Sequence, residues 1–194
     1  MRFPEIIFFC MAAALLTGGA AAQTMTESPD GPEQVKVYLT MDEALGKVFA
    51  KADTLWSENW TPAPEEIQEM EAHLGWRIPE QEFTFHRARH RGKDLGFAVV
   101  TEEKGRFKPI TFMVMVSPDR EVGKVEVMVY RESRGDGVRR QRFLKQFRGK
   151  ESTDPLRLNR DITVLSGATL SSRAITAGVK RVLYLVQKRY GNGS

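Results

Sequence analysis

The chain has 194 residues, of which 41% are hydrophobic and 28% are charged. These proportions exclude a collagen-like or low-complexity chain and a multispan membrane protein, and the length suits one ordinary domain. The formal net charge of +4 is too small to indicate nucleic-acid binding without a concentrated basic patch. We therefore expect a globular protein that has no nucleic acid among its partners.

Residues 1–22 have the pattern of a secretory signal peptide. Arg2 precedes an apolar stretch from Ile6 to Leu16, and the small residues Ala20–Ala22 end the segment. A positive start, a short apolar core and an Ala-x-Ala end predict cleavage after Ala22 and export to the periplasm. The alternative is an uncleaved N-terminal anchor that keeps the protein at the membrane, because residues 15–22 could lengthen the apolar span.

Cleavage would also remove Cys10, which is the only cysteine. The mature chain would then have no thiol, and so no disulfide and no cysteine-based attachment of a metal or haem. Two closely spaced histidines, His86 and His90, fall among arginines in a predicted strand, where we expect exposed polar residues and not metal ligands. The sequence predicts no metal site.

The first predicted elements follow a polar segment. Residues 23–34 contain two prolines and are predicted to be a flexible lead-in. Residues 35–39 alternate like a short strand, and Thr40 with Glu43 gives the Thr-x-x-Glu pattern of a capping box. The helix that begins there is predicted to run to about Leu55.

A second helix is predicted to begin within residues 61–66, which hold prolines and acids, and to end at Gly75. From Glu82 onward the apolar period is two, which is typical of strands. Four strands are predicted, at Phe83/Phe85, Leu95–Val100, Ile110–Val116 and Val122–Tyr130, with polar turns at 101–105 and 117–120.

The basic run 139–148 contains Phe143, Leu144 and Phe147 at helical spacing. We expect a short amphipathic helix whose apolar side packs inward, with binding to anionic lipid or an acidic partner as the alternative. A last helix is predicted from about Ser171 to Arg189. The fold class is therefore α+β, an antiparallel sheet backed by helices, with the C-terminal helix directly after a distinctive loop.

That loop is a run of small and hydroxyl-bearing residues at the start of the last helix. It reads Ser166, Gly167, Ala168, Thr169, Leu170, Ser171 and Ser172. Small residues let a phosphate approach backbone N–H groups, and the helix dipole favours its charge. A plain N-cap by Ser171 or Ser172 is the other interpretation, and spacing alone leaves the two open.

The segment Ser-Gly-Ala-Thr followed by Leu-Ser-Ser resembles the flavinylation motif of the FMN-binding domain family. That family includes the G subunit of the Rnf electron-transport complex, the C subunit of the sodium-pumping NADH:quinone reductase, and small exported proteins. The resemblance implies FMN esterified through its phosphate to Thr169 by a magnesium-dependent flavin transferase. Residues 38–45, 130–135 and 142–150 also resemble the small exported members. The FMN-binding domain itself would cover residues 93–188, after an N-terminal part formed by 35–92.

One departure from the family pattern is Thr163, where an aspartate commonly stands. If the transferase recognises that carboxylate, modification would be slow or Asp161 would have to substitute for it. By analogy with the family, we expect residues 132–137 to lie beside the flavin. Three arginines are candidates to balance the phosphodiester charge, namely Arg131, Arg134 and Arg173.

The resemblance and the signal peptide together predict an exported flavoprotein with covalent FMN. It would relay electrons between a membrane-bound redox partner and an extracytoplasmic acceptor, as a carrier and not as a stand-alone enzyme. Nothing near Thr169 in the sequence is an obvious base, so a separate transferase is expected to attach the flavin. The alternatives are a flavin-dependent reductase of a small substrate and a binding module that carries no flavin.

Overall fold

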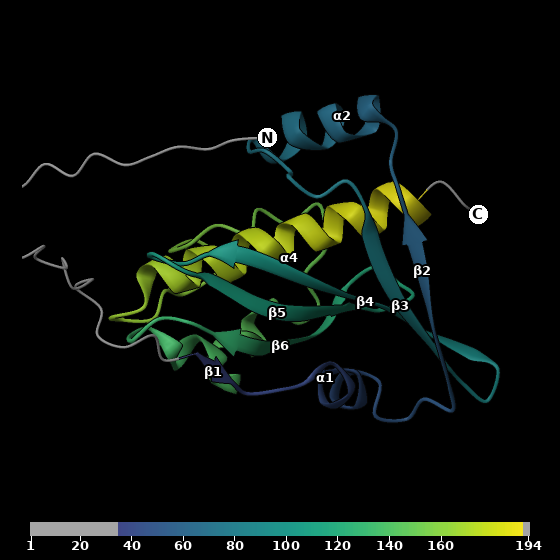
Figure 1. Cartoon of the computed structure of the whole chain (residues 1–194), viewed down its shortest axis with the longest axis horizontal. Coiled ribbons are helices and arrows are strands. Elements are labelled where there is room, and N and C mark those ends of the chain that lie inside the picture. Colours follow the sequence, from purple (N-terminus) through teal and green to yellow (C-terminus); the bar gives the residue numbers. More distant parts are fainter. Residues whose placement is uncertain (1–34, 192–194) are drawn as a thin grey trace, which may run out of the picture. The chain divides into compact units, whose positions relative to one another are not determined.

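The computed structural model describes residues 35–191, so the predicted signal peptide and lead-in, residues 1–34, lie outside the described residues. A six-stranded antiparallel sheet has the order β1-β6-β5-β4-β3-β2 (Figure 1). Its strands are β1 (Lys36–Val37), β2 (Thr54–Trp60), β3 (Phe83–His90), β4 (Lys93–Lys104), β5 (Pro109–Val116) and β6 (Val122–Tyr130). This sheet and its helices confirm the predicted α+β class.

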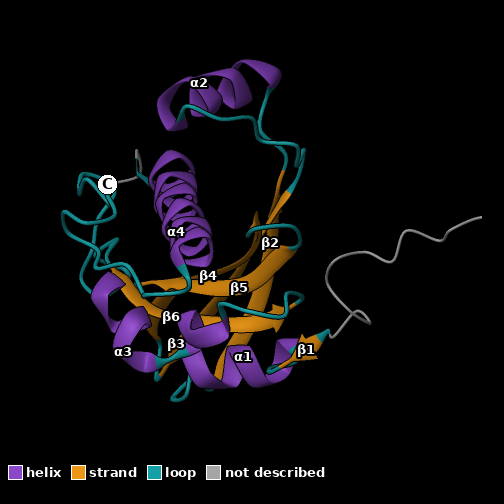
Figure 2. Cartoon of the chain, turned by 90° about the vertical axis from the view of Figure 1, so that its left-hand side faces the viewer, coloured by secondary structure: helices purple, strands orange, loops and turns teal. Residues whose placement is uncertain are grey.

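The helices lie on both faces of the sheet (Figure 2). They are α1 (Met41–Val48), α2 (Pro64–Leu74), α3 (Gln141–Leu144) and α4 (Thr169–Tyr190), with short 3-10 turns η1 (Asp136–Arg139) and η2 (Lys145–Phe147). The larger apolar cluster includes Phe112 of β5 and Val179 of α4, and the smaller one includes Leu45 of α1 and Met113 of β5. Because side chains alternate along a strand, neighbouring β5 residues serve the two clusters.

The predicted capping box of α1 is confirmed. The backbone N–H of Glu43 donates to Thr40 Oγ1 at 3.3 Å, and the Thr40 N–H donates to the Glu43 carboxylate at 2.8 Å. The predicted extension of this helix to Leu55 is wrong, because α1 ends at Val48 and residues 54–60 form β2. These residues pair with β3 along their whole length, and this tertiary pairing outweighs the local helical pattern.

The second helix and all four predicted strands are confirmed. Helix α2 begins with Pro64 and ends at Gly75 in the left-handed conformation, at φ 83°. The predicted turn at 101–105 is wrong, because β4 continues to Lys104, which pairs with Pro109. The polar residues of this extension are held by partners distant in sequence, since Glu102 pairs with Arg131 and Glu103 with Arg181.

The basic run forms η1, α3 and η2 in succession. Phe143, Leu144 and Phe147 are buried in the main apolar cluster, so the predicted inward packing is confirmed. All five cationic residues of the run are exposed, namely Arg139, Arg140, Arg142, Lys145 and Arg148. Of the helices in residues 35–191, none combines the length and the apolar character needed to cross a bilayer.

Helix α4 approaches β4 and β5 closely near its middle. A Cβ on Gly178 would lie 2.3 Å from the Phe112 ring and 3.0 Å from Glu103 Cγ. A glycine is therefore required at this crossing, and it brings the helix within reach of the polar end of β4.

Candidate functional site

The distinctive loop leads directly into α4, which begins at Thr169. The first helical hydrogen bond runs from the Ser172 N–H to the Ala168 carbonyl at 2.8 Å. The N–H groups of residues 169–171 therefore lie outside the helical ladder and point out of its N-terminus. The predicted start at Ser171 was two residues late. The N-cap is Ala168, with no side-chain hydrogen bond, so capping by Ser171 or Ser172 is wrong.

The seven loop residues divide into an exposed and a buried set. Ser166, Gly167, Thr169 and Leu170 are exposed, whereas Ala168, Ser171 and Ser172 are buried. Ser172 Oγ lies 3.4 Å from the Leu165 N–H, and Ser171 Oγ lies 2.8 Å from Tyr130 Oη. Two hydroxyls of the loop, those of Ser166 and Thr169, thus face solvent and are open to modification.

The buried serine fixes the first turn of α4 to the end of β6. Tyr130 Oη donates to the Arg134 carbonyl at 2.5 Å, so its oxygen accepts from Ser171. Burial raises the pKa of Tyr130 to about 12, and the phenol remains a donor throughout the physiological range. A Cβ on Gly135 would lie 2.6 Å from Tyr130 Oη, so this turn closes tightly around the hydroxyl pair.

The residues before the loop are held in two different ways. The Asp161 carboxylate accepts the N–H groups of Leu156 at 3.1 Å and Arg157 at 2.7 Å, and it pairs with Lys150 at 3.4 Å. Thr163 is exposed, and its backbone N–H and carbonyl bond the Gln146 amide at 2.8 and 3.2 Å. Asp161 thus holds its own loop, which argues against its replacing the carboxylate missing at Thr163.

A cavity of about 300 Å³ opens beside the first turns of α4. It is lined by Leu170, Arg173, Ala174 and Ala177 of α4, by Glu103, Lys104 and Gly105 at the end of β4, and by Trp76. Trp76 Nε1–H is buried and has no hydrogen-bond partner among the described residues. A buried donor without a partner costs stability, and the aromatic side chain of Trp76 is what this wall offers to the cavity.

The other candidate residues near the site have partners of their own. Arg131 donates to Thr111 Oγ1 at 2.8 Å and pairs with Glu102 at 3.4 Å. Glu132 is buried and accepts the N–H groups of Phe107 at 2.7 Å and Lys108 at 3.1 Å, which fixes the turn after Gly105.

Two other arginine candidates differ in position. Arg134 is exposed and contributes its backbone carbonyl to Tyr130. Arg173 lines the cavity beside Leu170. Of the three arginines proposed from the sequence, Arg173 is the one that the structure brings to the cavity.

The sequence did not indicate Trp76 or Glu103. Neither belongs to the motif, and Trp76 comes from the segment that follows α2, far from Thr169 along the chain. Only tertiary packing, of α4 on β4 and of α2 on α4, brings them to the cavity. The histidines form no cluster with other ligands: His86 Nδ1 lies 2.8 Å from Ser57 Oγ, and residues 35–191 contain no group of three metal-ligating side chains.

Comparison with known proteins gives a consistent result. The family model described as FMN-binding domain matches residues 105–184. The G subunit of the proton-translocating ferredoxin:NAD(+) oxidoreductase complex of Clostridium ljungdahlii is 30% identical over 107 residues, which are 51% of this chain and 57% of the relative. The chain therefore spans little more than half the length of that relative.

Two solved structures are also similar. NqrC of Shewanella oneidensis has a TM-score of 0.48 at 17% identity, and the match covers 69% of this chain and 79% of that protein. The C subunit of the Na(+)-translocating NADH-quinone reductase of Parabacteroides distasonis has a TM-score of 0.43 at 13% identity, over 74% of this chain and 84% of that protein. The family match assigns residues 105–184 to the FMN-binding domain family, and the curated relative is similar to this chain over 107 residues.

Proposed function

We propose that the protein carries FMN covalently on Thr169 and relays electrons between a membrane-bound redox partner and an extracytoplasmic acceptor. The observation that carries the proposal is the position of Thr169. Its exposed side chain stands at the N-terminus of α4, next in the chain to Leu170, which lines the cavity that Trp76 and Arg173 also border.

The residues around this cavity fit the parts of FMN. N–H groups at the start of α4 and the Arg173 guanidinium suit a phosphodiester. Leu170, Ala174 and Trp76 offer the apolar and aromatic surface that a flat ring requires. Bound FMN would supply the capacity to accept and release electrons, while the protein holds and orients it.

Attachment would need a separate catalyst. No described residue forms a hydrogen bond with the Thr169 hydroxyl, and an unactivated hydroxyl is a weak nucleophile. A magnesium-dependent flavin transferase would join Thr169 Oγ1 to the flavin phosphate, so that the product is the sum of protein and FMN less one water. Ser171 and Ser172 are buried and unsuited as acceptors, which leaves Ser166 as the competing hydroxyl.

The size of the cavity favours a carrier over a reductase. Small-molecule sites range from about 300 to 1,000 Å³. The volume of about 300 Å³ beside Thr169 is at the lower end of that range, and a flavin ring would leave little room for a second small molecule. This geometry favours exchange of electrons with a protein partner at the exposed rim of the cavity. The curated relative, which is a subunit of an oxidoreductase complex, supports the same role.

The decisive experiment is intact mass, with flavin fluorescence after denaturation, on protein made with and without a flavin transferase. We expect a transferase-dependent gain of one FMN less one water in the wild type and in Ser166→Ala, and no gain in Thr169→Ala. A folded wild-type protein that gains no flavin would refute the proposal. A gain that persists in Thr169→Ala and disappears in Ser166→Ala would move the attachment to Ser166.

Export is tested separately, by sequencing the N-terminus of protein recovered from the periplasm. Cleavage after Ala22 gives a chain that begins at Gln23. A chain that keeps residues 1–22 and sediments with membranes would instead establish the anchor.

A further inference from the structure

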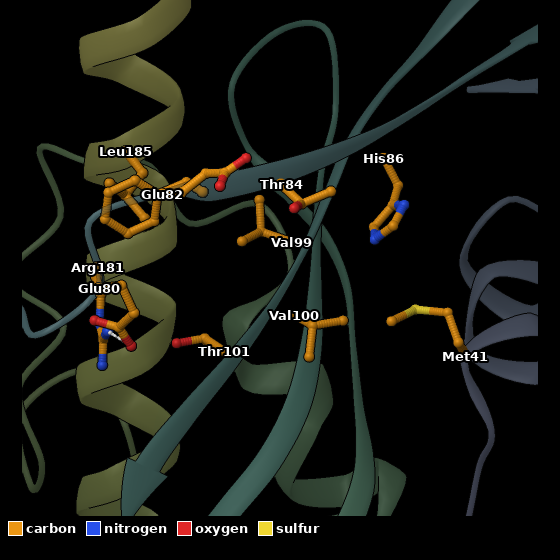
Figure 3. Close-up of a pocket in the computed structure, with 11 residues that line it drawn as sticks. Met41, Glu80, Glu82, Thr84, His86, Val99, Val100, Thr101, Arg181 and Leu185 are labelled. Carbon is orange, nitrogen blue, oxygen red and sulfur yellow. Dashed lines mark hydrogen bonds and ion pairs between the residues drawn. The ribbon is translucent and has the colours of Figure 1, made fainter. Parts of the chain in front are cut away.

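A buried ion-pair network lies where α4 crosses the end of β4. Arg181 of α4 is only 4% exposed. Its Nε donates to Glu103 Oε1 at 3.0 Å, Nη2 also bonds Glu103, and Nη1 donates to Glu80 Oε1 at 2.8 Å. Figure 3 shows Glu80 reaching the Arg181 guanidinium beside α4. One guanidinium thus holds two carboxylates.

The network exists because the sheet divides at this point. Strands β3 and β4 pair from His86 and Ala98 to the hairpin, and beyond that pair β4 bonds only β5 (Figure 3). The free edge of β4 is partly satisfied by Arg181, whose Nη2 donates to the Glu102 carbonyl at 3.2 Å. The arginine therefore substitutes for a missing strand partner, which fixes its position and that of Glu103.

The network also separates two cavities. Glu103 lines the cavity beside Thr169. Arg181 and Glu80 line a second cavity, of about 330 Å³, in the wedge between the diverging strands. The Glu80 side chain is 38% exposed, but its Oε2 is buried and its Oε1 is held by Arg181, whereas the Glu103 side chain is 15% exposed and borders its cavity directly. Glu103 is thus a partly buried carboxylate that can exchange protons directly with water in the cavity beside the first turns of α4.

We propose that Glu103 is a proton-exchanging carboxylate coupled to the redox state of the flavin, held in position by Arg181 and Glu80. This inference rests on the function proposed above. When the donor delivers negative charge to the cavity, the Glu103 carboxylate binds one proton from solvent and becomes neutral. When the electrons leave for the acceptor, the proton returns to solvent.

The charges around Glu103 make this exchange possible. Burial raises the pKa of Glu103, the Arg181 cation lowers it, and the Glu80 carboxylate raises it again. Three further charged groups border the cavity or its wall, namely Lys104, Glu132 and Arg173. The balance leaves the pKa of Glu103 above that of an ordinary glutamate, and added negative charge at short range in a poorly solvated cavity would raise it further.

The test measures the midpoint potential of the flavin-loaded protein as a function of pH. Glu103→Gln keeps the size and the bond to Arg181 but cannot exchange a proton. We expect the midpoint potential of this variant to lose the part of its pH dependence that comes from protonation of Glu103. Glu102→Gln is the matched control, because Glu102 is the neighbouring glutamate and its side chain is paired with Arg131. A Glu103→Gln profile identical to wild type would overturn the proposal.

Substitutions of the two neighbours of Glu103 should shift the pH range in which it titrates in opposite directions. Arg181→Gln removes the cation, so the pH range in which Glu103 titrates should move upward. Glu80→Gln removes a negative charge, so that range should move downward. Thermal unfolding of each variant establishes that it is folded, and shifts of the same sign in both folded variants would contradict the assignment.

A second readout does not depend on activity. Difference infrared spectroscopy on reduction should show a protonated carboxyl band in the wild type and in Glu102→Gln. The band should be missing in Glu103→Gln. Flavin loading is measured independently by intact mass, so failure to load refutes the proposed function, whereas normal loading without this band refutes the role of Glu103 alone.

Discussion

Tyr130 Oη and Ser171 Oγ lie 2.8 Å apart, and this contact joins the end of β6 to the first turn of α4. The residues are 41 positions apart in the chain, and both are buried. Because Thr169 lies two residues before Ser171, the contact sets where the exposed hydroxyl stands relative to the sheet. The proposed attachment site is thus positioned by a hydrogen bond and not by the loop alone.

Removing the Tyr130 hydroxyl should loosen this junction. Tyr130→Phe leaves Ser171 Oγ and the Arg134 carbonyl without their buried partner. We expect a loss of about 1–3 kcal/mol in unfolding free energy, measured by denaturant titration, and slower flavin attachment. Tyr184→Phe is the control, since the Tyr184 ring stacks on His73 and its hydroxyl has no hydrogen bond among the described residues. Equal losses in the two variants would contradict a special role for Tyr130.

Two glycines near the site separate backbone strain from steric collision. Gly135 and Gly167 both have positive φ, at 92° and 75°. A Cβ on Gly167 meets nothing within 4 Å, whereas one on Gly135 meets Tyr130 Oη at 2.6 Å and Ser171 Oγ at 2.7 Å. Gly167→Ala should cost about 1–2 kcal/mol, which is the strain of a left-handed alanine. Gly135→Ala should cost about 1–3 kcal/mol more. Calorimetric melting of both variants checks this, and similar melting temperatures would disprove the collision.

The residue at position 163 should control the rate of flavin attachment. Thr163 is exposed and its backbone is held by Gln146, so an aspartate side chain can enter without disturbing the fold. If the transferase requires a carboxylate there, Thr163→Asp should accelerate flavin incorporation several-fold in a timed mass assay. Thr61→Asp, which adds the same charge at the exposed end of edge strand β2, should leave the rate unchanged. An unchanged rate of flavin attachment in Thr163→Asp would show that the transferase does not recognise the residue at this position.

Asp161 should make the loop before the motif sensitive to acid. Burial opposes its charged form, but the Arg157 and Leu156 N–H groups and Lys150 outweigh this and lower its pKa below the ordinary 3.8. A depressed carboxylate pKa stabilises the fold at pH values above the unfolded-state pKa, and this stability disappears as the pH falls through the folded-state value. Wild type should therefore be more stable than Asp161→Asn at neutral pH, and the difference should shrink as the pH falls below the ordinary 3.8 and through the folded-state pKa. A pH-independent difference would argue against this linkage.

Local chemistry in the sequence was enough to predict many elements. The Thr40–Glu43 capping box, the proline start and glycine end of α2, and the alternating apolar pattern of the four strands from Phe83 to Tyr130 are all visible among residues close in sequence. The motif at 166–172 was found in the same way, because a run of small and hydroxyl residues before a helix is a local pattern. Strand β2 was missed because its conformation is decided by pairing with β3, some 30 residues later in the chain.

The sequence by itself thus determined the α+β class, most of the element boundaries and the one segment on which the family resemblance rests. Only the tertiary structure decided which hydroxyls of that segment face solvent, since burial of Ser171 depends on Tyr130 and burial of Ser172 on the packing of α4. It also brought Trp76 and Glu103 to the cavity beside Thr169. These contacts form only when whole elements pack together. They join residues distant in sequence, so no residue spacing along the chain predicts them.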